Sequence, residues 1–265
     1  MTELAQKSLK ALSGTLTKEI ENERIAEQLV IVNECEKIPP KAIRAKTPLD
    51  VRNVPSSFEL QVNMIEPVEP RRIEYRVALK GWLPAEGDKP LLQVMKRAGR
   101  DLAKWENSVI RDSLLSAAGK SIVTREVDSA VNELPGFITG NGYEPNKLLI
   151  NPSDAARLAE AGMITRQHFH SDFSWSKGSS FIGVINDLDV HCMQAVRKGI
   201  AIIYDHLEVE LFRITPKMTF DDSTSPKSLV ILAQCAVLPT TEAVAAVDFG
   251  HSSRIPTDTR QNAAV

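Results

Sequence analysis

The stretch "KPLLQVMKRAGRDLAKWENSVIRDSLLSAAGK" at residues 89–120 has a helical pattern of unusual length. It contains no proline after Pro90, and Gly99 is its only glycine before Gly119. We predict one helix over residues 91–118, about 28 residues and roughly 42 Å long at 1.5 Å of rise per residue. Helices in globular proteins average about 11–12 residues, so this one is far longer than usual. Gly119 suits the position just after the last helical residue, where glycine commonly ends a helix.

The apolar residues of this predicted helix form a narrow stripe with alternating steps of four and three. They are Leu91, Met95, Ala98, Leu102, Trp105 and Val109. Charged residues stand between them, at Lys96, Arg97, Arg100, Asp101, Lys104, Glu106, Arg111 and Asp112. This pattern is typical of a solvated helix resting on a sheet. A two-stranded coiled coil is less well supported, because only about three heptads are present. We expect Leu102 and Trp105 to be buried, and Arg97, Arg100 and Lys104 to face solvent or a neighbouring subunit.

The N-terminal segment also has a helical pattern. Leucine and isoleucine recur at helical spacing over residues 3–37, with charged residues between them. Pro39 and Pro40 end this pattern, because proline lacks the N–H group and keeps the preceding residue out of the α region. Residues 41–57 show no period, and we expect an extended arm there.

Two alternating runs follow the arm. "FELQVNMIE" at residues 58–66 and "RIEYRVALKGW" at residues 72–82 each alternate apolar and polar side chains. The short proline-containing link "PVEPR" at residues 67–71 separates them, which predicts a hairpin. A lone hairpin is marginal in water, so it needs a surface in this chain or in a neighbour.

The remainder of the chain mixes short helices and strands. We expect a short helix ending at Pro135, a turn around Gly140 and Gly142, and a helix that begins at Pro152. Residues 164–180 are polar and aperiodic and predict a loop. Strand patterns occupy residues 147–151, 181–187, 188–196, 199–214 and 228–249, the last split by Pro239.

Composition limits the possible functions. The chain has 265 residues, 43% hydrophobic and 25% charged, which is enough for a sizeable core. Its net charge of −2 argues against a protein that wraps nucleic acid with a basic surface. Three scattered cysteines, Cys35, Cys192 and Cys235, argue against a disulfide framework and favour synthesis in a reducing cytoplasm. We find no secretory signal pattern and no apolar run of membrane-spanning length, and we expect no membrane association.

The search for catalytic and metal-binding motifs gives mostly negative results. There is no phosphate-binding glycine loop, nucleophile elbow or dinucleotide fingerprint. His168 and His170 form an H-x-H pair, but no carboxylate or cysteine stands at ligand spacing beside them. His191 and Cys192 are sequence neighbours, which point to opposite faces of a strand. We therefore assign no catalytic, cofactor-binding or metal-binding residue, and we expect no cofactor.

The remaining acidic and histidine residues have ordinary interpretations. Asp187 with Asp189, and Asp221 with Asp222, lie in turn-like contexts where aspartate serves the backbone. His206 stands apart from the other histidines.

An extended arm and a hairpin cannot fold stably alone, so they predict contacts between identical subunits. Basic residues at the hairpin tip suit an acidic neighbour. We predict subunit contacts at Pro67, Val68, Glu69, Arg71, Arg72, Arg97, Arg100 and Lys104.

Three stretches carry a family resemblance. They are "LAKWENSVIRDSLLSAAGK" at residues 102–120, "GYEPNKLLINPSDAARLAEAG" at 142–162, and "SPKSLVILAQCAVLPTTEAVAAVDF" at 225–249. With the hairpin and the long helix before them, their order over residues 40–250 resembles the major capsid protein of tailed bacteriophages. This Hong Kong ninety-seven-type fold is shared with encapsulin nanocompartments.

The resemblance implies an α+β fold whose long helix is the "spine" of a peripheral domain. It divides the chain into an N-terminal helical segment and arm (1–55), an extended hairpin loop (56–88), a peripheral domain with the spine helix (89–130), an axial domain (131–207), closing peripheral strands (208–250) and a C-terminal tail (251–265). Some family members form a lysine–asparagine crosslink. Lys80 lies in the second hairpin strand, but nothing beside it suggests an acid catalyst, and we expect no crosslink.

The function implied is structural rather than enzymatic. The resemblance implies a virion protein, assembled in the host cytoplasm, that forms hexamers and pentamers of an icosahedral head around double-stranded DNA. Decoration, scaffold or portal proteins are the further partners it implies. The alternative is an encapsulin-type compartment that holds enzyme cargo. An ordinary α/β enzyme is a third interpretation, which the absence of catalytic motifs disfavours.

Overall fold

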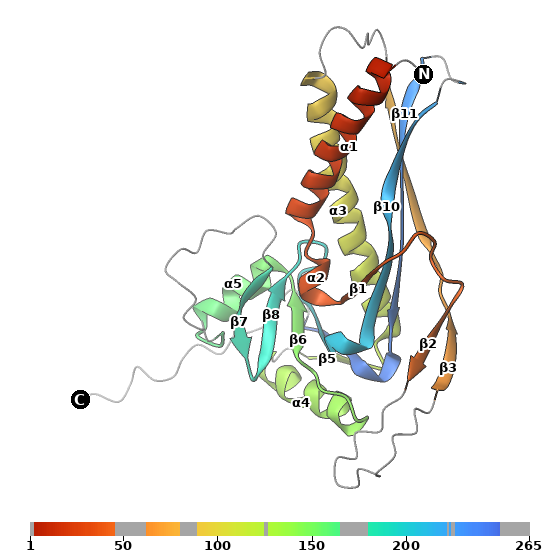
Figure 1. Ribbon diagram of the computed structural model, residues 1–265. Coiled ribbons are helices and arrows are strands. Elements are labelled where there is room, and N and C mark those ends of the chain that lie inside the picture. Colours follow the sequence, from red (N-terminus) through yellow and green to blue (C-terminus); the bar gives the residue numbers. More distant parts are fainter. Residues whose placement is uncertain are drawn as a thin grey trace, which may run out of the picture.

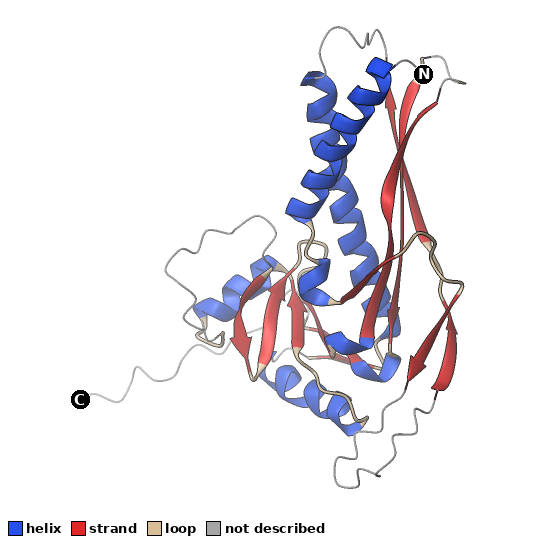
Figure 2. Cartoon of the chain, viewed as in Figure 1, coloured by secondary structure: helices blue, strands red, loops and turns tan. Residues whose placement is uncertain are grey.

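The computed structural model describes residues 3–45, 62–79, 89–124, 127–164, 180–221, 223 and 226–249. An elongated unit of helices and long strands stands beside a more compact unit near its lower end (Figures 1 and 2). His168, His170, Lys80, Asp222 and the tail at 251–265 lie outside the described residues. No described helix is long and apolar enough to cross a membrane.

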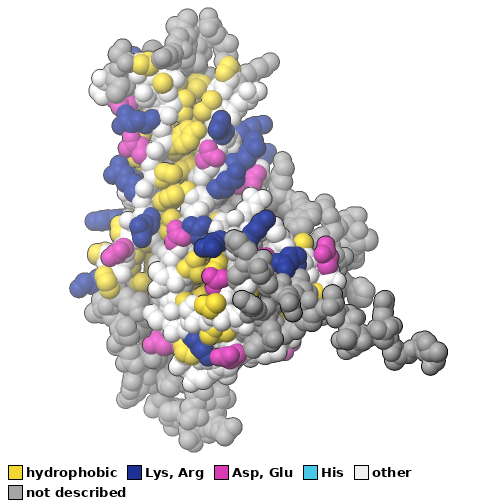
Figure 3. Space-filling model, turned by 180° about the vertical axis from the view of Figure 1, so that it is seen from behind, with side chains coloured by type: hydrophobic (Ala, Val, Ile, Leu, Met, Phe, Trp, Pro, Cys, Tyr) yellow, Lys and Arg dark blue, Asp and Glu magenta, His cyan; other side chains and the backbone are white. Residues whose placement is uncertain are grey.

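The elongated unit is a four-stranded sheet with two helices along one face. The strand order is β1 (Ile31–Glu34), β10 (Val209–Asp221), β11 (Ser228–Pro239) and β4 (Arg71–Ala78). Helices α1 (Glu3–Glu23) and α3 (Lys89–Ala117) cover the sheet (Figure 1). Their shared core contains Leu12, Leu16, Met95, Leu102 and Ile231. A hydrophobic stripe remains visible along this unit, with Lys and Arg on both sides (Figure 3).

The long helix agrees with the prediction. It has 29 residues, Lys89–Ala117 against the predicted 91–118. Leu102 is buried as expected, whereas Trp105 is only partly buried at the border of the core. Gly119 follows the helix, and glycine is needed there because the backbone of Thr241 passes close to it. A Cβ at this position would lie 2.6 Å from the Thr241 carbonyl oxygen.

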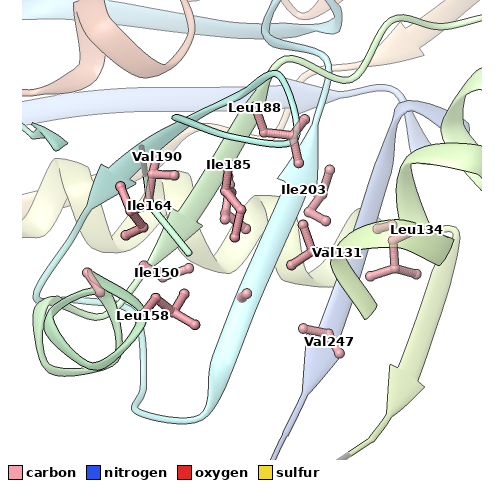
Figure 4. Close-up of a cluster of buried hydrophobic side chains, with 14 of the residues drawn as sticks. Val131, Leu134, Ile150, Leu158, Ile164, Ile185, Leu188, Val190, Ile203 and Val247 are labelled. Atoms are coloured by element: carbon pink, nitrogen blue, oxygen red, sulfur yellow. The ribbon is translucent and has the colours of Figure 1, made fainter. Parts of the chain in front are cut away.

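The compact unit is a six-stranded mixed sheet. Its strand order is β5 (Lys120–Val123), β12 (Val244–Asp248), β9 (Ile200–Tyr204), β6 (Lys147–Ile150), β8 (Leu188–Cys192) and β7 (Phe181–Ile185). Helices α4 (Val127–Gly140) and α5 (Pro152–Glu160) bury Leu134 and Leu158 in a core with Ile150 and Ile203 (Figure 4). The strand and helix predicted at 147–151 and from Pro152 are confirmed, and Asn151 caps α5 by accepting from the Ser153 N–H at 2.9 Å.

The opposite face of the six-stranded sheet joins the two units. Leu149, Ile202 and Tyr204 point into a core that also contains Leu114 of α3 and Leu211 of β10. The chain passes between the sheets at the short helices η1 (His206–Glu208) and η2 (Thr241–Ala243). The run predicted at 199–214 is therefore two strands in different sheets.

The predicted hairpin between residues 58–66 and 72–82 is wrong in its pairing. Strand β3 (Val62–Pro67) pairs with β2 (Lys41–Ala45), whereas β4 pairs with β11. Alternation identifies a strand and its buried face, but the partner depends on where that face finds a core. For β4 this core is the α3 side of the elongated unit, where Ile73, Tyr75 and Val77 pack.

Two predicted helix ends are also wrong. The N-terminal pattern breaks after α1 into a short α2 (Ala26–Leu29) and then β1, which pairs in parallel with β10. The β-branched residues Ile31 and Val32 suit that sheet position. Helix α4 continues through Pro135 to Gly140, because Val131, Leu134 and Ile138 on both sides of the proline are buried against the sheet. Gly142 forms the expected turn with a φ of 86°.

Candidate subunit-contact surface

The eight residues predicted to contact other subunits lie in two places. Pro67, Glu69, Arg71 and Arg72 are exposed around the link between β3 and β4. Val68 in the same link is only 6% exposed, because it packs with Ile38, Ala42, Ala236 and Leu238 of its own chain. Val68 therefore anchors the link instead of presenting a contact side chain.

A groove lies beside this link. Its walls are the link, the last turns of α3 and the end of β11, and its volume is about 290 Å³. Carbonyl groups at a helix C-terminus lack intrahelical partners and carry a partial negative charge. The groove combines this helix end with charged and apolar side chains. The lining residues are Pro67, Glu69, Arg71, Ser113, Ser116, Ala117, Val237, Leu238 and Pro239.

The second group of predicted contact residues stands on the exposed side of α3. Arg97, Arg100 and Lys104 are all exposed, as expected. The Arg100 guanidinium lies 3.4 Å from Glu19 of α1, and Arg97 lies 4.0 Å from Asp101. Exposed ion pairs of this kind contribute at most about 1 kcal/mol, so these cations are available to a partner.

The edge strand β4 is a feature that the sequence prediction missed. One side of β4 pairs with β11, and the strand is the last in the sheet order, so its outer backbone groups have no partner strand among the described residues. Its half-buried Ile73, Tyr75 and Val77, with Val94 and Trp105 of α3, pack at the border of the core.

In the space-filling view, charged side chains stand on both sides of the hydrophobic stripe along the elongated unit (Figure 3). On the opposite face of β4, Arg76 pairs with Glu74 and donates to Asp221 at 2.8 Å. Arg97 and Lys104 stand on the exposed side of α3. The exposed cations beside the apolar strip are therefore those of α3, because Arg76 is paired with two carboxylates. An edge strand beside such a strip suits an extended segment with apolar and acidic side chains.

A cluster of five charges, also missed, fixes the base of the elongated unit. Arg213 of β10 donates to Glu27 at 2.6 Å and to Glu34 at 2.8 Å, and it lies 3.5 Å from Glu106. Arg24 lies 3.1 Å from Glu106, which is only 3% exposed. Burial raises the pKa of Glu106, although both arginines oppose this. The available signal was an arginine inside the strand pattern "LEVELFRI".

Three residues that the sequence offered as candidates for catalysis or metal binding have structural roles instead. Burial raises the pKa of the Cys192 thiol to about 11, which leaves it protonated and unreactive at neutral pH. Asp187 lies in a turn with a φ of 65°, and Asp189 pairs with Lys147 at 2.9 Å. Across the part of the chain that the structure describes, no group of three or more His, Cys, Asp or Glu side chains is placed to hold a metal ion.

Comparison with known proteins gives similarity of fold. No family model and no curated protein matches the sequence. A virus-like particle protein from Pyrococcus furiosus is 14% identical, with 90% of this chain and 98% of that chain covered and a TM-score of 0.59. The encapsulin of the holo-SrpI complex from Synechococcus elongatus is 15% identical, with 88% and 89% covered and a TM-score of 0.56.

A third similar structure is the capsid of an empty GTA particle. It is 13% identical, with 86% of this chain and 90% of that chain covered and a TM-score of 0.53. These alignments include both the elongated unit with its long helix and the six-stranded unit beside it, because they cover most of the chain. The chain is therefore an α+β protein with the Hong Kong ninety-seven-type fold found in capsid and encapsulin shells.

Proposed function

We propose that this chain is a structural shell protein that assembles in many copies into a closed icosahedral container. The observation that carries this proposal is the two-stranded sheet β2–β3, which projects from the body (Figure 1). Its base is held by Ala42 and Val68. A two-stranded sheet is marginal in water by itself, so the projection needs a surface on another copy.

The fold supports a division of labour between the two units. In this proposal the elongated unit is the peripheral domain, and α3 is its spine. The compact unit is the axial domain, extended by β5 and β12 beyond the predicted 131–207. Six-fold and five-fold rings of copies then form the faces and vertices of the shell.

The contact surface proposed for a neighbouring copy is the free edge of β4 with the apolar border beside it. The segment "FELQVNMIE" at residues 58–66 alternates apolar and polar side chains, and it contains two acidic residues, Glu59 and Glu66. In this proposal its apolar side chains cover the apolar border beside β4, and its carboxylates face the exposed cations of α3. Inter-subunit burial at roughly 25 cal/mol per Å², repeated over many copies, would stabilise the particle.

We propose a virus head that encloses double-stranded DNA as the first candidate, and an encapsulin-type compartment with enzyme cargo as the second. If the chain forms a virus head, we expect it to assemble in the host cytoplasm, with scaffold, portal or decoration proteins as further partners. The net charge of −2 is compatible with a genome held by weak lining contacts.

The test is electron microscopy of the expressed full-length protein in negative stain. Closed particles support the shell proposal, whereas a monomer or small oligomer under every assembly condition would refute it. Ultraviolet absorbance and nuclease-protected nucleic acid in purified particles then distinguish the two candidates. Particles with one co-purifying protein and no nucleic acid would exclude the virus head.

A further inference from the structure

We infer that Asn141 and Gly142, at the C-terminal end of α4, form a deamidation site that reacts only when the end of the helix opens. They are the only Asn-Gly pair in the sequence, and both residues are exposed. In such a pair the glycine backbone nitrogen attacks the asparagine Cγ, because glycine has no side chain to shield that nitrogen. The new N–Cγ bond displaces Nδ2 as ammonia, and water then opens the cyclic imide to aspartate or isoaspartate.

The attacking nitrogen is engaged in the folded chain. The Gly142 N–H donates to the Thr139 carbonyl oxygen at 2.9 Å, and the Tyr143 N–H donates to the Ile138 carbonyl oxygen at 3.2 Å. These are the two hydrogen bonds of a Schellman cap, which requires the left-handed conformation that Gly142 adopts at a φ of 86°. Attack requires the Gly142 N–H to lose its proton, as hydrogen exchange does, so both reactions need the same opening of this bond.

The side chain that would be attacked is held as well. Asn141 Nδ2 donates to the Phe137 carbonyl oxygen at 3.1 Å, which ties the amide to the last turn of α4. Ile138 and Tyr143 are buried in the core of the compact unit, at 0% and 9% exposed. Opening the end of α4, along the lower side of this unit (Figure 1), therefore breaks the cap and separates apolar side chains from the core.

The product cannot rebuild this cap. An ionised carboxylate at position 141 only accepts hydrogen bonds, so it would face the Phe137 carbonyl oxygen without a proton to donate. Its charge would also stand at a helix C-terminus, where the partial charge is negative. Isoaspartate adds a methylene group to the main chain, which displaces the following N–H groups from their acceptors. Deamidation thus makes a transient opening of α4 permanent, and this inference is independent of the proposed assembly.

The test is mass spectrometry of peptides covering residues 137–146 after incubation of the full chain in mildly alkaline buffer. The chain unfolded in urea should deamidate at Asn141 more than about tenfold faster than the folded chain. Hydrogen exchange of the same peptides, measured in parallel, should show that the folded helix end is protected. Equal rates of deamidation in the folded and unfolded chains would overturn the inference, as would an unfolded chain that stays intact.

A matched pair of variants tests whether the cap controls the reaction. Ile138→Val weakens the anchor of the cap and should speed deamidation of the folded chain by about two- to tenfold, with no change in the unfolded chain. Ile185→Val makes the same change on β7 in the same core and should leave the rate at Asn141 unchanged. If the two variants act alike, local opening of α4 does not control the reaction and the inference fails.

Asn141→Asp tests the effect of one product directly. It should lower the hydrogen-exchange protection of peptides at 137–146 by about threefold or more, through the lost donor and the added charge. Peptides covering α5 should keep their protection. Unchanged protection at 137–146 would show that the product rebuilds the cap, which would overturn the inferred permanence of the opening.

Discussion

At the residue scale, Gly99 explains how two long helices approach each other. A Cβ at this position would lie 2.9 Å from Glu19 Cβ and 3.1 Å from the Leu16 carbonyl oxygen. Glycine inside a helix costs about 1 kcal/mol relative to alanine, so its helix propensity alone would disfavour it. The closeness of α1 to α3 is the compensating gain. Gly14 on α1 has nothing within 4 Å of its added Cβ and offers a matched comparison.

Gly99→Ala and Gly14→Ala should change stability in opposite directions. Both gain helix propensity, worth about 0.5–1 kcal/mol, and Gly14→Ala should show this gain. Gly99→Ala should instead lower the free energy of unfolding by about 1 kcal/mol, because the methyl group overpacks the contact. Urea denaturation of the two variants measures the difference. A higher free energy of unfolding in both variants would contradict this, because it would show that α1 can move away from the added methyl group at no cost in stability.

His191 predicts a pH dependence of stability at the same scale. Burial and the nearby Lys147 lower its pKa to about 4 in the folded chain, against about 6.5 when unfolded, so the unfolded state binds more protons between these values. Stability should therefore fall as pH decreases from about 6.5 to 4, by up to about 3 kcal/mol from this residue. The difference in unfolding free energy between wild type and His191→Asn, measured at pH 7 and pH 4, isolates this contribution from the carboxylates. A constant difference across this range would contradict it.

At the element scale, α3 serves two surfaces at once. Leu102 lies inside the core of its own subunit at 3% exposed, whereas Trp105 is only partly buried and packs against both the core of the elongated unit and the core that joins the two units. The sequence pattern predicted that both residues are buried, because they lie on the same apolar face of the helix. Such a pattern shows which face is apolar, but it does not show how much of that face the rest of the subunit covers. The border residue is the one that a neighbouring copy can cover.

Substitutions along α3 should separate folding from assembly. Leu102→Ala should lower the free energy of unfolding by about 2–5 kcal/mol, as expected of a buried leucine. Trp105→Asp should leave a folded subunit but abolish soluble assembled particles, while Gln93→Asp at an exposed position should assemble normally. Circular dichroism with particle counting by electron microscopy measures both properties. Intact shells from Trp105→Asp would contradict this placement of the contact.

At the scale of the whole molecule, two units are held together by a mixed junction. An apolar core with Tyr204 and Leu114 supplies the burial, and the cluster around Arg213 fixes the approach of α2 and β1. A buried charge that loses its partner is costly, whereas an exposed pair contributes little. The junction should therefore depend on Arg213 much more than the elongated unit depends on its surface cations.

Arg213→Met should destabilise the chain by about 3–5 kcal/mol, because it leaves Glu106 buried beside a reduced positive charge. Arg100→Met removes the exposed pair with Glu19 and should cost at most about 1 kcal/mol. Thermal or urea unfolding of the two variants compares them directly. Similar losses from both substitutions would mean that the buried cluster adds no specific stability.

The sequence by itself determined the elements whose pattern is local. The period of α3, the Asn-Pro start of α5 and the β-branched closing strands depend on near neighbours in the chain, and each was predicted close to its observed place. The order of these elements was enough to indicate the fold.

Only the tertiary structure decided the partners: β4 pairs with β11 and β3 pairs with β2, and β1 continues a sheet where a helix was expected. The Arg213–Glu106 pair and the hydrogen bond from the Ser180 N–H to Gln28 likewise join residues more than 100 and 150 positions apart. Such contacts follow from which apolar faces meet in the core, and no local spacing carries that information.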